Sequence, residues 1–396
     1  MIGKCKPGFK TMLMACAFVF VLVLVSCSAR LDHPDVEPEK LLALRTHLEE
    51  NARDPYEYIA DKLDEHDLVF IGEIHGVRHN LVFIQRLIPF LHQMGIYSLC
   101  TEFARREDQG LIDSLLAEEI WDEALAREIT FRHNVHWGFQ EYVDVFKAAW
   151  KSNRSSKDSM RPFRIIGVND SPDWSFVTRK DDRQSGEIMR KVWQGGGEEF
   201  WARIILDEVI ARGEKAVVYS GIHHAFTEYL QPICDGDGEF IRFEENRMGN
   251  FIYREIGKRA ITVFLHGPWR PTRGYGKMEI YPVDGVIDVL ITTLGKGVLP
   301  AGFDTHGTPF GSLEGETSIY SRGYEEFSLE TFCDGYIVFD AFSVFEGMSP
   351  IDDFVNGENI DYARKNDSQP RYRKATVDEF KKSMRKRARI GYRHLY

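Results

Sequence analysis

The sequence has few cysteines, and they form no recognisable metal or disulfide motif. Six of the 396 residues are cysteine, and Cys5 and Cys16 lie before residue 27, at the N-terminus. Cys100, Cys234 and Cys333 are far apart in the chain and show no Cys-x-x-Cys spacing. An odd number of widely separated thiols argues against a disulfide framework and against a cysteine zinc site.

Other features are missing after the N-terminal segment. There is no further apolar run long enough to cross a membrane, no glycine-rich phosphate loop, no Gly-x-Ser-x-Gly motif and no internal repeat. Excess positive charge is also lacking, since the formal net charge is −11. An acidic chain is a poor match for a polyanion, so we predict that nucleic acid is not a partner. Apolar and charged fractions are ordinary for a globular protein.

The first residues have the pattern of a bacterial lipoprotein signal. Three lysines precede an apolar run over residues 12–25, which ends in Leu-Val-Ser followed by Cys27. This ending matches the lipobox, in which the cysteine becomes acylated after cleavage. We predict a signal peptide over residues 1–26 and lipidation at Cys27, with an ordinary signal anchor as the alternative. The predicted location is the cell envelope, facing outside the cytoplasm on a bacterial membrane. In a Gram-negative cell this is the outer membrane, because Ser28 replaces the aspartate associated with inner-membrane retention.

The rest of the chain divides into three predicted parts. Residues 27–58 are interpreted as a tether and a docking helix, and residues 59–345 as an α/β core with a helical insertion over 104–160. Residues 346–396 are predicted to form a basic tail, with twelve Lys/Arg against three Asp/Glu from residue 364 onward. Such a run is typical of a solvated helix face, although it would also suit anionic lipid headgroups. The region beyond 267 is rich in Gly and Pro and is predicted to be irregular, with a strand around 286–292.

Five apolar segments in the core region are predicted as buried strands, and each leads into polar residues. The strands cover residues 68–71, 96–101, 164–168, 215–221 and 260–265, and the candidate site residues that follow them are Glu73, His75, Glu102, Asp170, His223, His224 and His266. Helical patterns separate these strands, so we predict a mostly parallel sheet flanked by helices. Carboxyl ends of parallel strands meet at one edge, where ligands bind. For any single residue, a helix cap or a satisfied core histidine is the alternative.

Glutamate and histidine together suit two kinds of hydrolytic site. Glu73, His75, Glu102 and His224 include the ligand types that bind Zn²⁺, Mn²⁺ or Co²⁺, and such a metal activates water. Without a metal, a histidine oriented by a carboxylate acts as a general base while a second histidine stabilises the oxyanion. The sequence leaves both open.

Two further motifs have simpler interpretations. His133 and His136 are spaced to share a helix face and bind a metal or haem, but the Trp-Gly that follows them favours a turn. The acidic stretch from Asp235 to Glu239 resembles a calcium loop, yet its spacing does not fit an EF-hand. A hairpin turn is the favoured interpretation of that stretch.

The chain also resembles a known superfamily. Gly72-Glu73-Ile74-His75-Gly76, Glu102, Gly167-Val168-Asn169 and Gly221-Ile222-His223-His224-Ala225 are similar to motifs of the superfamily that joins erythromycin-esterase-like enzymes, Tiki/TraB proteins and ChaN-type haem-uptake lipoproteins. The likeness covers about residues 65–270. It implies an α/β fold whose Glu/His cluster is the working site. Gly76 departs from the ChaN branch, which typically has Asp there, and a single His79 stands where that branch has paired histidines.

Three hypotheses follow for the function. The first is a hydrolase of ester or amide bonds, acting on a small-molecule or peptide substrate. The second is a haem- or metal-binding lipoprotein for iron uptake, which needs an apolar slot with an axial His or Tyr. The third is a non-catalytic scaffold that retains the cluster.

Overall fold

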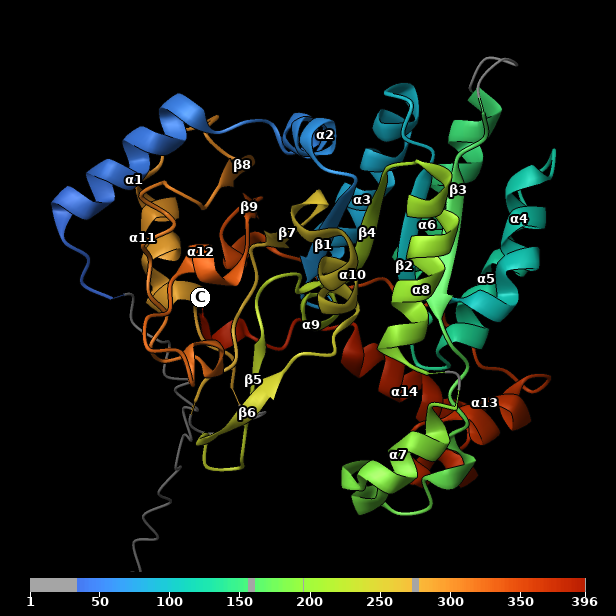
Figure 1. Cartoon of the computed structure of the whole chain (residues 1–396). Helices are drawn as coiled ribbons and strands as arrows, with labels where there is room; N and C mark the ends of the chain where they lie inside the picture. The colour runs from blue at the N-terminus through green and yellow to red at the C-terminus, as the bar shows by residue number, and fades with distance from the viewer. Residues whose placement is uncertain (1–33, 156–160, 195, 273–277, 396) are drawn as a thin grey trace, which may run out of the picture.

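A seven-stranded sheet forms the centre of the molecule (Figure 1). The computed structural model describes residues 34–155, 161–194, 196–272 and 278–395. The strands lie in the order β3-β2-β4-β1-β7-β9-β8 and are parallel, except that β8 is antiparallel at one edge. Their bounds are β1 Leu68–Glu73, β2 Ser98–Arg105, β3 Arg164–Asn169, β4 Ala216–Gly221, β7 Ala260–Leu265, β8 Ala301–Asp304 and β9 Gly335–Val338. The predicted α/β class with a mostly parallel sheet is confirmed.

The apolar sequence of β1 explains its central place. All six of its residues are buried. Successive side chains point to opposite faces of a strand, so Val69 and Ile71 join one hydrophobic cluster while Leu68 and Phe70 join the other. A strand covered on both faces needs apolar residues at every position, which is why the sequence shows a continuous apolar run rather than an alternation.

Helices cover both faces of the sheet. The cluster that contains Val69 also takes in residues of α2 Pro55–Glu65, α3 Arg78–Gln93, α4 Gln109–Ala117, α5 Glu123–His133 and α6 Gln140–Ser155. The opposite cluster takes in residues of α1 Pro38–Asn51, α8 Glu198–Glu208, α9 Ile222–Ala225, α10 Met248–Ile256 and α11 Val286–Thr293. The helices predicted between the second and third strands are α4, α5 and α6, and α1 contains the helix expected in the docking segment.

Two predictions about strands need correction. The strand expected around 286–292 is wrong, because α11 occupies Val286–Thr293. Its buried Ile287 and Leu290 are three residues apart, and a short apolar run does not distinguish a strand from a buried helix. The second strand also continues beyond its expected end, to Arg105. Glu102 therefore lies inside β2 rather than after it.

The acidic stretch after Cys234 forms the expected hairpin turn. It joins β5 Gln231–Cys234 to β6 Phe240–Glu244, which pair in antiparallel fashion and project from the body in Figure 1. The Asp235 carboxylate accepts hydrogen bonds from the backbone N–H groups of Asp237 and Glu239 at 2.9 and 3.0 Å. The carboxylate is thus used to shape the turn, as in an Asx-turn.

The C-terminal residues pack against the helical insertion. Of the helices α13 Ile360–Asn366 and α14 Val377–Arg387, the second buries Phe380 and Met384 in the same cluster as the α5 and α6 side chains. Beside them, His136 and Asp367 form a buried hydrogen bond of 2.5 Å. His136 is therefore committed to packing and does not share a face with His133.

Several predictions fall outside this description. The signal peptide, Cys27 and the first part of the tether lie before residue 34 and outside the described residues. Within the described ranges, no helix has the length and apolar character that a membrane crossing requires. The proposed division into domains stays a prediction.

Candidate active site

Four of the predicted residues come together over three neighbouring strands. Glu73 is the last residue of β1, Glu102 lies in β2, and His224 lies in α9 directly after β4. Because β4 lies between β1 and β2 and pairs with both, the residues that directly follow β1 and β4 lie near Glu102. His75, two residues after β1, completes the group, which we call the Glu/His cluster.

The central pair of the cluster is Glu73 and His75. A carboxylate oxygen of Glu73 accepts a hydrogen bond from Nδ1 of His75, and the Glu73 side chain is only 1% exposed. The His75 side chain is 47% exposed. Asn80 donates to the other Glu73 oxygen at 3.4 Å. When Nδ1 carries the proton that Glu73 accepts, Nε2 is the atom with a free lone pair, which is the orientation a general base needs.

Gly221, at the end of β4, makes room for this arrangement. A Cβ atom built at this position would lie 2.7 Å from Cε1 of His75 and 3.2 Å from Oε1 of Glu102. The backbone N–H of Gly221 donates to that same Glu102 oxygen at 2.7 Å. Glycine is required because the His75 ring and the Glu102 carboxylate both lie against its Cα.

His224 lies between two carboxylates. Its Nε2 is 3.2 Å from Glu102, and its Nδ1 is 2.9 Å from Glu198 on α8. The second contact is an ion pair without an aligned hydrogen bond, since Nδ1 of His224 has no hydrogen-bond partner of suitable geometry among the described residues. Arg247 holds Glu198 in place at 2.6 Å. Charges of alternating sign thus extend from Glu102 to Arg247.

These contacts change the protonation of both histidines. Burial alone lowers the pKa of His75, but the charge and hydrogen bond of Glu73 outweigh it and raise that pKa above the usual 6.5. For His224, burial is likewise outweighed by Glu198 and Glu102, and the pKa rises to about 9. Burial alone raises the pKa of Glu198, yet His224 and Arg247 lower it to about 2. His224 and Glu198 are therefore both charged at neutral pH.

Aromatic side chains form one wall beside His75. The ring of Trp137 lies 5.0 Å from that of His75, and the ring of Phe103 lies 5.8 Å away, both edge to face. His133 contacts Trp137 at 5.6 Å. Burial, with Arg105 and His75 nearby, lowers the pKa of His133 to about 3, so this histidine is neutral. The wall is apolar and uncharged, and it limits the access of water to one side of His75.

The other three predicted residues have different surroundings. Asp170 accepts hydrogen bonds from the Trp201 indole at 2.9 Å and from the Gly197 N–H at 3.2 Å. It therefore supports the start of α8, the helix that carries Glu198. His223 is bound to the Tyr320 hydroxyl at 2.8 Å, and burial lowers its pKa well below 6.5.

His266 is buried between β7 and α11. Its Nδ1 is 2.9 Å from the Tyr336 hydroxyl and its Nε2 is 3.3 Å from Asp288. The ring stacks on Phe342 at 4.7 Å. Both nitrogens are used within the protein, so His266 acts in packing rather than in the cluster.

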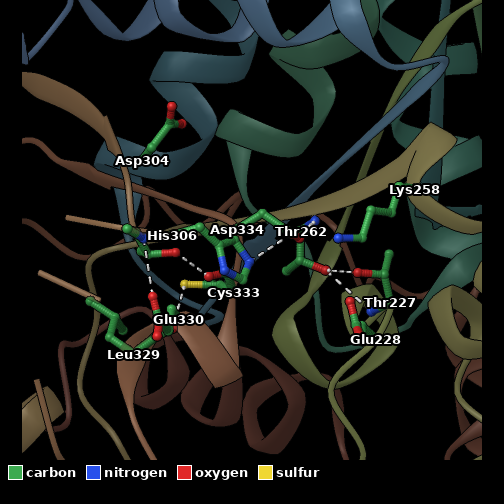
Figure 2. A network of polar contacts seen from close by, with 12 residues as sticks. Thr227, Glu228, Lys258, Thr262, Asp304, His306, Leu329, Glu330, Cys333 and Asp334 are labelled. Carbon is green, nitrogen blue, oxygen red and sulfur yellow. Dashed lines mark hydrogen bonds and ion pairs between the residues drawn. The ribbon is translucent and has the colours of Figure 1, made fainter. Parts of the chain in front are cut away.

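A second polar network lies near the amino ends of β7 and β9 (Figure 2). Here Asp334 accepts a hydrogen bond from the Thr262 N–H at 2.8 Å, and its own N–H donates to the Thr262 carbonyl at 2.9 Å. The other carboxylate oxygen is 3.2 Å from His306, and the Thr262 hydroxyl is 2.9 Å from that of Thr227. The network satisfies the sheet backbone where β9 begins.

The predicted metal site does not fit the cluster. Among the described residues, no three His, Cys, Asp or Glu side chains are arranged so that they could hold a metal ion. Glu73 is bound to His75, and both nitrogens of His224 face glutamates. Glu73, His75, Glu102 and His224 therefore form carboxylate–imidazole pairs instead of a Zn²⁺, Mn²⁺ or Co²⁺ site.

Glu198 and Arg247 were not predicted from the sequence. Glu198 begins a helix after a glycine run, and Arg247 precedes α10. Neither follows a strand of the main sheet, which was the signal used to select candidates. Only the three-dimensional arrangement connects them to His224.

The family comparison supports the resemblance seen in the motifs. Residues 59–156 match the family model described as haem-binding uptake, Tiki superfamily, ChaN. The matched span contains Glu73, His75 and Glu102, and the resemblance is confirmed over this part of the chain. A search of curated proteins finds no match.

Solved structures match this chain at low sequence identity, and one of them has a TM-score above 0.5. A structure described as a succinoglycan biosynthesis protein is 11% identical and has a TM-score of 0.51, covering 81% of this chain and 99% of that one. A mutant of the erythromycin esterase EreC in its open conformation is 11% identical, with 75% and 96% coverage and a TM-score of 0.46. ChaN of Campylobacter jejuni with cofacial haem is 12% identical, with 59% and 91% coverage and a TM-score of 0.34. The chain is thus similar in fold to the first of these and resembles the ChaN/Tiki superfamily over residues 59–156.

Proposed function

We propose that this chain hydrolyses an ester or amide bond with His75 as the general base. One observation carries the proposal: a buried glutamate, Glu73, is bound to Nδ1 of an imidazole that is half exposed. The carboxylate fixes the ring and the tautomer, so Nε2 keeps the lone pair that accepts a proton. The raised pKa of His75 makes it a stronger base than a free imidazole.

The reaction has two proton transfers. Nε2 of His75 removes a proton from water as the water oxygen bonds to the substrate carbonyl carbon. Negative charge then develops on the carbonyl oxygen, and the cationic His224 stabilises it electrostatically. When the tetrahedral intermediate collapses, His75 returns the proton to the departing alkoxide or amine. The products are a carboxylic acid and an alcohol or amine.

The activity would be located in the cell envelope. We place the protein outside the cytoplasm, tethered by acyl chains at Cys27, because the N-terminal sequence has the lipobox pattern. Mass spectrometry of protein extracted from membranes with detergent tests this placement. A mature chain that begins with a diacylated or triacylated Cys27 supports it, and an unmodified chain that retains residues 1–26 contradicts it.

The hydrolytic proposal is tested on the soluble body, residues 28–396, with 4-nitrophenyl acetate as ester probe and an acyl 4-nitroanilide as amide probe. His75→Ala and Glu73→Ala are expected to lose turnover by about 10²–10⁴-fold, the usual contribution of a general base, while circular dichroism shows a folded protein. His266→Asn, a change outside the Glu/His cluster, is the matched histidine control. Unchanged hydrolysis in both cluster variants contradicts the proposal.

Haem binding is a second candidate, favoured by the family match and by the exposed His75 beside Trp137. In that case His75 would hold the haem iron through Nε2, and the aromatic wall would supply an apolar lining for the group. Titration with haemin distinguishes the candidates. A stoichiometric Soret band that is lost in His75→Ala, without hydrolysis of either probe, would favour haem binding.

A further inference from the structure

A pocket separate from the Glu/His cluster lies along α3. It has a volume of about 420 Å³, which is within the usual range for small-molecule sites. Its lining comes from α3, the start of α2, Pro300 before β8 and the region after β9, and it contains no residue of the Glu/His cluster. Its floor contains three aromatic rings, with Phe83 lying 5.1 Å from both Tyr56 and Phe339. Such a floor suits a flat apolar ring.

The two ends of the pocket have different polar groups. His79, Phe83 and Arg86 all line it and occupy positions i, i+4 and i+7 of α3, so they lie on one helix face. Seven residues correspond to about 10 Å along the helix axis. His79 is therefore at one end, the aromatic ring in the middle, and Arg86 at the other end.

The Arg86 end is suited to an anion. Arg86 is exposed and lies against the phenol of Tyr56, and it forms no ion pair with a carboxylate in the part of the chain that the structure describes. In contrast, the pocket's other arginine, Arg78, is paired with Glu141 and Glu346. Arg86 is hydrogen-bonded to Tyr56 but is a cation without a carboxylate partner among these residues, at the end of an aromatic slot, and an arginine in this setting suits a carboxylate ligand.

The His79 end is suited to a neutral polar group. The His79 ring lines the pocket and stacks on Phe345 at 5.0 Å, with its Nδ1 enclosed within the protein. Asp340 also lines this region, and its negative charge disfavours an anion there. A hydroxyl group can both accept from an imidazole N–H and donate to a carboxylate.

We propose that this pocket binds an aromatic carboxylate of one or two fused rings, with the carboxylate on Arg86 and a ring hydroxyl at the His79 end. The length of the slot, its aromatic floor and the different polar groups at its two ends together select this class. The site is independent of the hydrolytic activity proposed for the Glu/His cluster.

The test is isothermal titration of the soluble body with 6-hydroxy-2-naphthoate and with its neutral amide, 6-hydroxy-2-naphthamide. Saturable binding of the acid is expected, with the amide at least about tenfold weaker, the value of one charge-assisted hydrogen bond. Arg86→Gln should lower the affinity for the acid by a similar factor and leave the affinity for the amide unchanged. Arg203→Gln, an exposed arginine paired with Glu199 on α8, is the matched control.

Two further variants locate the ligand. His79→Ala should lower the affinity for 6-hydroxy-2-naphthoate but not the affinity for 2-naphthoate, which lacks the hydroxyl. His75→Ala should leave the affinity for the acid unchanged, because His75 does not line this pocket. The proposal is overturned if the acid shows no saturable binding at millimolar concentration, if Arg86→Gln binds it as well as the parent protein does, or if His75→Ala abolishes binding.

Discussion

Carboxylates lie at both ends of the strands of the main sheet, and their partners differ between the carboxyl ends and the amino ends. Beyond the carboxyl ends of β1 and β4, Glu73 binds His75, while Glu102 and Glu198 face His224. Near the amino ends of β7 and β9, the Asp334 carboxylate accepts a hydrogen bond from the backbone N–H of Thr262. Both regions also contain a histidine beside an acid, since His306 is 3.2 Å from Asp334. An Asp–His contact by itself therefore does not identify a working site.

The difference lies in what each carboxylate leaves available. One oxygen of the Asp334 carboxylate accepts a hydrogen bond from the β7 backbone. The other oxygen is hydrogen-bonded to the exposed side chain of His306. Glu73, by contrast, is almost completely buried and bonds Nδ1 of an imidazole whose other nitrogen has no hydrogen-bond partner in the part of the chain that the structure describes. The first arrangement stabilises a strand, whereas the second prepares a base. The following variants test this distinction, beginning with the largest expected effect.

Glu73→Gln separates the charge of the pair from its shape. We expect kcat/KM to fall by about 10²–10⁴-fold, because the glutamine does not stabilise the imidazolium that forms during catalysis. The acid limb of the pH profile should also move to lower pH. Glu73 raises the pKa of His75, so its loss lets His75 deprotonate at lower pH. An acid limb that remains above pH 6.5 in the variant would contradict this account.

Gly221→Ala tests the close packing of the cluster. The added methyl group would lie 2.7 Å from the His75 ring, so the ring or the strand end must move. We expect about a 100-fold loss of hydrolysis, since small displacements of a positioned catalytic group have effects of that size. Gly213→Ala, in a turn where a Cβ atom meets nothing within 4 Å, is the control for a general effect of the substitution. Its φ of +68° predicts some loss of stability but none of activity.

His224 should make stability depend on pH. Its folded-state pKa of about 9 is above the ordinary 6.5, so its contribution is fully present below pH 6.5 and is lost as the pH rises through 9. We expect the free energy of unfolding to fall by about 3 kcal/mol over that interval. Urea titrations at several pH values measure this change. His224→Gln should remove the decline, and a decline of the same size in that variant would show that other groups cause it.

Asp334→Ala should produce the reverse outcome, a loss of stability without a loss of activity. The Thr262 N–H would lose its acceptor in the sheet, at a cost of about 1–2 kcal/mol. Hydrolysis should stay within about twofold of the parent protein at a temperature where both are folded. Asp334→Asn, which keeps an acceptor oxygen, should recover most of the stability. A large drop in kcat/KM for either variant would show that the Asp334 network and the Glu/His cluster are not independent.

The sequence pattern predicted that polar residues would gather at the carboxyl ends of the strands, but it did not predict the direction of each side chain. His223 and His224 are neighbours after β4, yet one binds Tyr320 while the other faces Glu102. Their order in the chain contains no information about which of them turns toward β2. His266 also follows a strand, but the aromatic rings around it and Asp288 enclose it within the protein.

The residues that escaped prediction come from helices and connections. Glu198 reaches His224 because α8 packs against α10 and β3, and Asp170 holds the start of that helix. No periodicity or motif relates residue 198 to residue 224. Such long-range pairs depend on how helices dock, which the local sequence does not determine.

The docking of the C-terminal segment has a consequence for when the site is completed. Asp367 holds His136, and the next residue, Trp137, lies against the ring of His75. The wall of the cluster is thus secured by a side chain more than 200 residues further along the chain. A ribosome must therefore synthesise the chain as far as Asp367 before that wall can form. Incomplete chains and proteolysed molecules that lack this segment would contain Glu73 and His75, but Trp137 would not be held against His75.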